Sequence, residues 1–385
     1  MSHRPGISCK SVLLAFSLLS LAQACAEPPR SEGRWAGKID TVAGVPVVRN
    51  PAAGIWDSET SWRLEPELKI GGAEASGPAV FGQVLGLEVD DRGSMYVLDG
   101  HASEIRVFDS SGSYVRSIGR SGRGPGEFRA PAGMAMDPNG RLWVVDQGNG
   151  RYVVFDTSGA FLKTFPRRLG SSVVLVRAGW QGEFVAGELH ELLLLPREMR
   201  IGFARYDTAS GTFSDTLRLG MGNPLPARGA GPVTLPRVLH HRLSESGRVW
   251  IGWSDEYRLY ELSLEGDTLR VIEREYQAVG AAAARADERS AAGSGRVQGF
   301  SEGAMVHRVL EERDGYVWVQ TGDPGRLTLD VFDPVGRYLG RLSADLRIPP
   351  LSPILMRREK LYAVAIDELD TQYVVRLGVR RPQGF

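Results

Sequence analysis

Short runs of β-branched and aromatic residues, separated by turns rich in Gly, Asp and Ser, recur along most of this chain. Residues 85–89, 95–98, 105–108 and 114–118 are four such runs, each four or five residues long. Runs of this length between turn residues are typical of β-strands. The four runs therefore predict one antiparallel, four-stranded meander.

The same unit returns further along the chain. Eleven positions recur without a gap at a constant offset of 47 residues, from Gly86 paired with Gly133 to Gly112 paired with Gly159. A turn followed by an aromatic residue marks six such units in all, at Tyr96, Trp143, Phe184, Trp250, Trp318 and Tyr362. Repeated sheets must bury their faces against neighbouring copies, so the repeat predicts six packed blades.

The two ends of the repeat region complement each other. The last unit ends in the strand 373–379 and has no fourth strand after it, whereas residues 62–71 end in the same Ile-Gly as the fourth strand 115–119. The N-terminal strand is therefore expected to complete the last blade, which removes the open ends of the array. The sequence predicts an all-β fold, a six-bladed β-propeller over residues 61–380.

Three segments interrupt the repeat. Residues 188–200 are expected to lengthen the middle of blade three, residues 220–236 form a Pro- and Gly-rich linker, and the Ala-rich residues 277–299 predict a short helix or a loop. Insertions in a propeller can cap a mouth of the central channel, so these segments could shape a site. They are equally compatible with loops that have no function.

The charge balance argues against one class of partner. The 385 residues hold 46 Lys and Arg against 46 Asp and Glu, which leaves no formal net charge. A protein that binds a phosphate backbone usually carries a strong excess of basic residues. We therefore expect no nucleic acid among the partners.

The first 24 residues have the pattern of a secretory signal peptide. A basic start that includes Lys10 precedes the mainly apolar residues 12–21, and small residues surround position 24. Cleavage after Ala24 would make Cys25 the N-terminus, the position at which a bacterial lipoprotein carries its lipid. Ordinary secretion, with Cys25 incidental, is the alternative. Both routes predict export to the periplasm, the outer membrane or the exterior, with membrane contact only through a lipid on Cys25.

Residues 25–60 are expected to form a tether and an N-terminal extension before the propeller. The two cysteines are Cys9 and Cys25, so the predicted propeller contains none. Disulfides, thiolate nucleophiles and Cys-rich zinc sites are therefore excluded from the folded body.

Blades one and two, residues 81–165, resemble NHL-repeat blades, including the Gly-rich connector 119–128 between them. The chain also resembles bacterial six-bladed propellers that are secreted or lipid-anchored. The second blade keeps the Asn-x-Arg of that family as Asn149 and Arg151, whereas the first blade has Ala102 and Glu104 at these places. This difference weakens the case for a ligand shared by the two blades.

Candidate binding residues lie in the loops after the second strand of each unit, because propellers bind ligands at a channel mouth. Five of them belong to blades one and two: Asp99, Glu104, Asp146, Asn149 and Arg151. A ring of carboxylates with a few arginines could hold Ca²⁺ or a polar ligand. The alternative is that an Asp at a strand end caps its own turn.

His240 and His307 lie at the start of predicted innermost strands. Three imidazoles that converge can hold Zn²⁺ and activate a bound water. The peptidyl-hydroxyglycine amidating lyases are similar in part, and this resemblance implies a third ligand from His101 or His190. Histidines satisfied by other contacts, or exposed to solvent, are the alternative.

Two functions remain open from the sequence. The first is a cell-envelope or secreted propeller that binds a protein, peptide or glycan at a channel mouth without catalysis. The second is a metal-dependent lyase or lactone hydrolase with its site in the central channel. No Ser-His-Asp order, nucleotide-binding Gly loop or HExxH motif is present to favour other chemistry.

Overall fold

The computed structural model describes residues 35–168, 182–185, 187–195, 200–220, 239–244, 247–253, 256–276, 306–312, 314–322, 326–349 and 352–382. These ranges belong to the unit Trp35–Phe385, and residues Met1–Arg34 form a separate unit. The predicted signal peptide and Cys25 lie outside the described residues.

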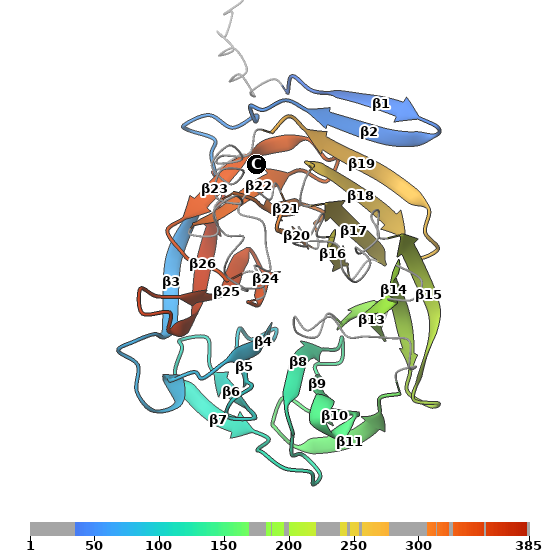
Figure 1. Ribbon diagram of the computed structural model, residues 1–385. Helices are drawn as coiled ribbons and strands as arrows, with labels where there is room; N and C mark the ends of the chain where they lie inside the picture. Colours follow the sequence, from blue (N-terminus) through green and yellow to red (C-terminus); the bar gives the residue numbers. More distant parts are fainter. Residues whose placement is uncertain are drawn as a thin grey trace, which may run out of the picture. The chain divides into compact units, whose positions relative to one another are not determined.

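Six sheets follow one another along the chain and are arranged around a common centre (Figure 1). Blade one contains β4 (Val84–Val89), β5 (Met95–Asp99), β6 (Glu104–Phe108) and β7 (Tyr114–Ile118). Blade two contains β8 (Pro131–Met136), β9 (Leu142–Asp146), β10 (Arg151–Phe155) and β11 (Phe161–Pro166). Blade three contains β12 (Gly182–Val185), β13 (Glu188–Leu195), β14 (Arg200–Asp207) and β15 (Thr212–Gly220).

The second half of the ring has the same plan. Blade four contains β16 (Leu239–Leu243), β17 (Arg248–Trp253), β18 (Arg258–Ser263) and β19 (Thr268–Arg274). Blade five contains β20 (Arg308–Glu311), β21 (Val317–Gln320), β22 (Leu327–Phe332) and β23 (Tyr338–Ala344). Blade six contains β24 (Ile354–Arg357), β25 (Lys360–Ile366), β26 (Gln372–Arg380) and β3 (Arg63–Gly71).

The first strand of each blade lies at the centre of the ring. Contacts join β4 to β8, β8 to β12, β16 to β20, β20 to β24, and β24 back to β4. Blades three and four meet through an apolar cluster that includes Phe203 and Leu243. The predicted six-bladed propeller is therefore confirmed, and its first strands are the innermost strands of the ring.

Tight turns join the strands of each meander. In blade one, Asp90 Oδ1 accepts the amide protons of Arg92 and Ser94, each at 2.8 Å, and Gly93 adopts a φ of +83°. A side-chain acceptor of this kind satisfies the turn amides, and glycine adopts a positive φ without a steric penalty. The Asp-x-x-Gly pattern thus explains the strand boundaries that the sequence predicted.

The closure of the ring follows the sequence prediction. Strand β3 pairs antiparallel with β26, in a register that joins Ile70 to Val374 and Arg63 to Arg380. An N-terminal strand thereby becomes the outermost strand of a sheet whose other three strands come from the C-terminal end. The pairing seals the last blade without leaving a free repeat at either end.

The segment before β3 has a role that the sequence did not predict. Strands β1 (Lys38–Val42) and β2 (Val45–Asn50) form a hairpin, and β2 pairs in parallel with β19 at the outer edge of blade four. Further on, the amide of Trp56 donates to the carbonyl of Leu339 on β23, at 2.8 Å. We call residues 38–62 the strap, because they cover the outer edges of blades four and five before β3 completes blade six.

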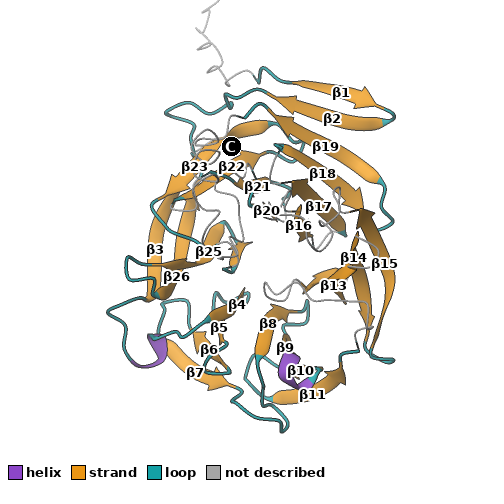
Figure 2. Ribbon diagram, in the orientation of Figure 1, coloured by secondary structure: helices purple, strands orange, loops and turns teal. Residues whose placement is uncertain are grey.

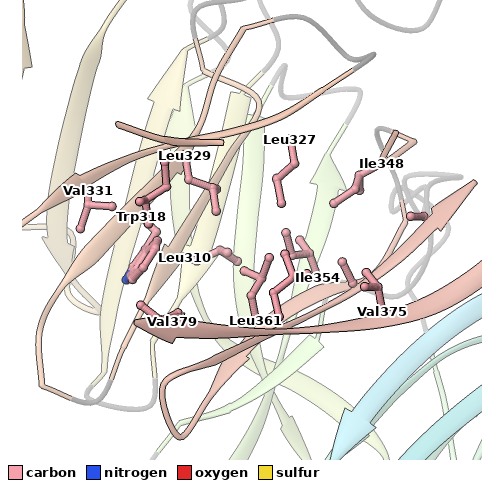
Figure 3. Close-up of a cluster of buried hydrophobic side chains, with 14 of the residues drawn as sticks. Leu310, Trp318, Leu327, Leu329, Val331, Ile348, Ile354, Leu361, Val375 and Val379 are labelled. Carbon is pink, nitrogen blue, oxygen red and sulfur yellow. The ribbon is translucent and has the colours of Figure 1, made fainter. Parts of the chain in front are cut away.

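Apolar side chains fill the space between blades. Figure 3 shows the cluster between blades five and six, where Trp318 of β21 and Leu361 of β25 are fully buried. Burial of one such side chain contributes about 1.5–3 kcal/mol. The interfaces between blades therefore hold the ring together, while hydrogen bonds hold each blade.

One predicted insertion is part of the regular fold. Residues Glu188–Leu195 form strand β13, so this part of the segment supplies a blade strand. Residues 221–236 and 277–299 lie outside the described residues. The only helices in the described ranges are two 3-10 turns, η1 (Gly77–Ala79) and η2 (Gln147–Asn149), and Figure 2 shows how strands dominate. Among the same residues, none forms a helix long and apolar enough to cross a bilayer.

Candidate ligand-binding face

Two kinds of loop meet on one face of blades one and two. The first kind leads into a first strand, as residues 77–83 and 119–130 do, and the second kind joins a second strand to a third. The amide of Gly100 donates to the carbonyl of Gln83, and that of Gly148 to the carbonyl of Arg129, each at 2.7 Å. We call this the connector face, and it carries the five loop residues that the sequence singled out.

Asp146 joins the two kinds of loop in blade two. Its carboxylate is fully buried and accepts the amide proton of Arg129 at 2.7 Å. It also accepts hydrogen bonds from Nδ2 of Asn149 at 2.7 Å and from Nε of Arg151 at 2.8 Å. The carboxylate therefore holds the connector and the β9–β10 loop together.

Asn149 and Arg151 continue this clamp into the connector. Nδ2 of Asn149 donates to the carbonyl of Gly122 at 3.1 Å. Nη2 of Arg151 donates to the carbonyls of Gly124 at 2.9 Å and Glu127 at 3.0 Å. The glycine-rich connector is thus fixed by charge-assisted hydrogen bonds, which are stronger than neutral ones.

Asp99 has the same role in blade one. Its buried carboxylate accepts the amide protons of Gly82 at 2.8 Å, Gln83 at 3.2 Å, His101 at 3.0 Å and Ala102 at 3.2 Å. Both loops of the blade are again tied to one carboxylate. The turn-capping alternative that the sequence allowed describes the contacts of Asp99 with the amides of His101 and Ala102. Asp146 makes no such cap to its own turn and binds the connector amide of Arg129 and two side chains instead.

In blade one, Arg106 has the role that Arg151 has in blade two, although Arg106 lies two residues further along its repeat unit. Glu104 occupies the place of Arg151 and binds Nε of Arg106 at 2.7 Å. Arg106 then pairs with Asp99 at 3.3 Å and donates to the carbonyls of Pro78, at 3.1 Å, and Val80. The difference between the two blades is therefore compensated, and an alignment at a constant offset could not reveal it.

These contacts limit the chemistry that the carboxylates of Asp99 and Asp146 can perform. The carboxylates of Asp99 and Asp146 have no exposed surface, and several donors from the chain already surround each one. A general acid or base must reach the proton that it transfers. As placed, the two side chains give rigid loops and do not present a reactive group.

The two histidines lie on neighbouring blades, as the sequence predicted from their strands. His240 belongs to β16, although its side chain is outside the description, and His307 directly precedes β20. Nε2 of His307 lies 2.8 Å from the carbonyl oxygen of Gly322. Burial lowers the pKa of His307, and the charge of Arg308 acts in the same direction.

The other two candidate zinc ligands come from different blades. His101 lies exposed in the β5–β6 loop of blade one, and His190 is buried in β13 of blade three. Within the described ranges, no three His, Cys, Asp or Glu side chains are grouped so that they could hold a metal ion. The positive charge of Arg308, which directly follows His307, also disfavours a bound metal cation there.

Sequence reasoning missed two arginines at the centre of the ring. Arg242 lies on β16 and Arg308 on β20, and these inner strands are in contact. Burial and the nearby charge of Arg242 lower the pKa of Arg308 to about 10. Both arginines also have interactions within the chain. Arg242 follows His241 in the segment LHHRL, and Arg308 directly follows His307, so each arginine stands next to a histidine in the sequence.

Buried ion pairs join neighbouring blades elsewhere. Between blades two and three, Arg167 binds Glu191 at 2.6 Å, and both side chains are almost fully buried. Between blades four and five, Arg274 binds Asp330 at 2.6 Å, and Arg341 of blade five binds the same carboxylate at 2.8 Å. Buried pairs of this kind are costly to break on one side, so they fix how the blades meet.

Comparisons with known proteins agree with this architecture. Residues 79–173 match the model of a protein family described as a 6-bladed beta-propeller. A search of curated proteins found no match to the chain. The matched segment spans the end of the connector before β4, blades one and two and the residues just beyond them.

Solved structures resemble the chain over most of its length. A protein of the duf4221 family from Bacteroides vulgatus is 11% identical, with 84% of this chain and 100% of that chain covered and a TM-score of 0.55. A protein from Bacteroides fragilis whose description assigns it as exported is 14% identical, with 87% and 100% covered and a TM-score of 0.52. At these identities the likeness shows the fold alone. The fold and the family match together define this protein as a six-bladed β-propeller.

Proposed function

We propose that this protein is an exported, non-catalytic propeller that binds a protein, peptide or glycan through the connector face and the adjoining channel mouth. The observation that carries the proposal is the pair of buried clamps at Asp99 and Asp146. Their carboxylates fix the loops that lead into the innermost strands of blades one and two. Loops that are ordered before binding reduce the entropy lost on association, so fixed loops favour recognition.

The charge at the centre of the ring supports a ligand with acidic groups. Arg242 and Arg308 lie on neighbouring inner strands, and each guanidinium is a fixed cation that suits carboxylate or sulfate oxygens. The proposal uses only the positive charge of the two side chains. It does not require either of them to be unpaired, because both have interactions within the chain. A metal-dependent lyase would need a cation at the same place, which these arginines disfavour.

Export rests on the N-terminal sequence. The basic start, the apolar stretch and the small residues before Cys25 have the order of a signal peptide, and Cys25 is the proposed lipid attachment point. The Bacteroides fragilis structure assigned as exported has the same fold. An exported propeller would meet proteins, peptides and glycans of the cell envelope.

The binding test uses defined acidic probes. Poly-L-glutamate and a polyuronic acid are titrated into the full chain by calorimetry, with neutral dextran as the control. We expect one of the acidic probes to bind, with an affinity that falls as salt rises. Arg308→Gln, and independently Arg242→Gln, should weaken this binding at least tenfold.

Arg380→Gln is the matched control, because Arg380 is an exposed arginine on the outer part of blade six, paired with Glu65. Like the two inner-strand variants, Arg380→Gln removes one positive charge, but at a site away from the inner strands. It should leave the affinity for the acidic probe unchanged. Equal affinity for the parent protein and both inner-strand variants would refute the proposal. Failure of both acidic probes to bind would refute it as well.

A further inference from the structure

The two ends of the propeller chain meet beside a turn of blade five. Trp62 directly precedes β3, and Arg381 directly follows β26, at the same end of the paired strands. The guanidinium of Arg381 lies 4.3 Å from the ring centroid of Trp62 and 5.0 Å from that of Tyr316. Arg381 therefore packs between the closing strand and the β20–β21 turn.

Three carboxylates surround this single cation. Glu312 lies 2.9 Å from Nη2 of Arg381, Asp314 lies 3.2 Å from Nη1, and Glu359 lies 3.7 Å from Nε. Glu312 and Asp314 belong to the turn of blade five, and Glu359 belongs to the β24–β25 turn of blade six. If all three acids were ionised, the cluster would carry two excess negative charges.

Glu312 is the acid that this arrangement keeps protonated most easily. Its side chain is 9% exposed, whereas those of Asp314 and Glu359 are 50% and 66% exposed. Nε1 of Trp318 donates to its carboxyl group at 3.1 Å. Burial in a low-dielectric site disfavours the ionised form of a carboxyl group.

Each group that faces Glu312 either raises or lowers its pKa. Burial raises the pKa of Glu312 to about 7, and the negative charges of Asp314 and Glu359 act in the same direction. Arg381 and the Trp318 donor act in the opposite direction and are outweighed. Tyr316 stays neutral over this range, because burial raises its pKa above 10.

We propose that Glu312 and Arg381 form a latch on the ring closure that is strongest in mild acid and weakens as the pH rises to neutrality. In the closed ring Glu312 keeps its proton. When the end of β26 separates, water reaches the carboxyl group and the proton passes to solvent. Opening therefore releases a proton between about pH 4.5 and 7, so a higher pH favours the open latch over this window. The device is independent of what the connector face binds.

Hydrogen exchange of β3 and β26 tests the latch directly. The full chain and Glu312→Gln are compared from pH 5 to 8, and protection factors are corrected for the intrinsic rate at each pH. The ratio of parent to variant protection should fall about tenfold per pH unit between pH 5 and 7 and then level off. Glu359→Gln, which replaces the most exposed acid of the cluster, should keep a fall in protection with pH of the same sign, because Glu312 stays buried; loss of the Glu359 charge should only move the fall to lower pH.

A flat ratio, or a ratio that rises with pH, would overturn the proposal. If Glu312→Gln does not fold, carboxyl-carbon NMR of the parent protein labelled at glutamate decides the matter. The latch predicts one glutamate that titrates near pH 7 and is absent from a folded Glu312→Asp variant. Titration of every glutamate below pH 5.5 would contradict it.

Discussion

At the scale of single residues, the connector face depends on carboxylates that bind backbone amides. Asp99 and Asp146 each tie a connector to the loop between the second and third strands. Arg151 in blade two and Arg106 in blade one extend these clamps by donating to connector carbonyls. Loop shape in these blades is therefore set by a few buried charges and not by loop packing alone.

Removal of a clamp carboxylate should destabilise the propeller. Asp146→Ala leaves the amide of Arg129 and the side chain of Arg151 without their acceptor in a buried site, which costs about 3–5 kcal/mol. At about 2–4 °C per kcal/mol, the melting temperature should fall by roughly 6–20 °C. Differential scanning calorimetry measures the change.

Asp109→Ala is the control for this experiment. Asp109 caps a turn of blade one through the same kind of amide contacts, but these hydrogen bonds are exposed to solvent. It should lower the melting temperature much less than Asp146→Ala. Equal effects of the two substitutions would show that burial of the clamp does not matter.

At the scale of elements, the sequence predicted the meanders better than the strap. The strands of blades one and two could be located because Asp-x-x-Gly turns and apolar runs repeat at a constant offset. The closing strand could be found because residues 62–71 resemble a fourth strand. Strand β2 has no counterpart in the repeat, and its partner β19 lies more than 200 positions away, so no local pattern indicated the parallel pairing.

The candidate site was harder to predict than the fold. The acids of the connector face could be placed from their position after a strand, and the turn contacts of Asp99 followed from turn chemistry. The contact of Asp146 with the amide of Arg129, 17 positions away, did not. The role of Arg106 depends on where its long side chain reaches, which no spacing rule reveals. The arginines at the centre of the ring required knowledge of which inner strands are neighbours.

A cross-link tests the pairing of β3 with β26. Arg63 and Arg380 are directly paired at an exposed end of the two strands. Paired residues of antiparallel strands have Cα atoms about 4.5–5.5 Å apart, within the range that a disulfide spans. Arg63→Cys with Arg380→Cys, in a background with Cys9→Ser and Cys25→Ser, should form a disulfide that peptide mass spectrometry detects. Arg63→Cys with Arg347→Cys is the control pair and should remain reduced; the reverse pattern would contradict the closure.

At the scale of the whole molecule, the ring is asymmetric. The strap covers the outer edges of blades four and five, and β3 forms the outer edge of blade six. The outer strands of blades one and two keep exposed apolar side chains, among them Val115 and Leu162. The two blades with the best repeat therefore keep uncovered apolar side chains on their outer strands, and the strap does not reach them.

We propose that this propeller binds an acidic ligand near its inner strands and does not act through a resident metal. Native mass spectrometry of the full chain, with and without poly-L-glutamate and the polyuronic acid, tests it most directly. We expect the mass of the metal-free chain and a 1:1 complex with one acidic probe, and this complex should be weaker in Arg308→Gln. A chain that carries one tightly held zinc, lost in His307→Ala, and binds neither probe would contradict it.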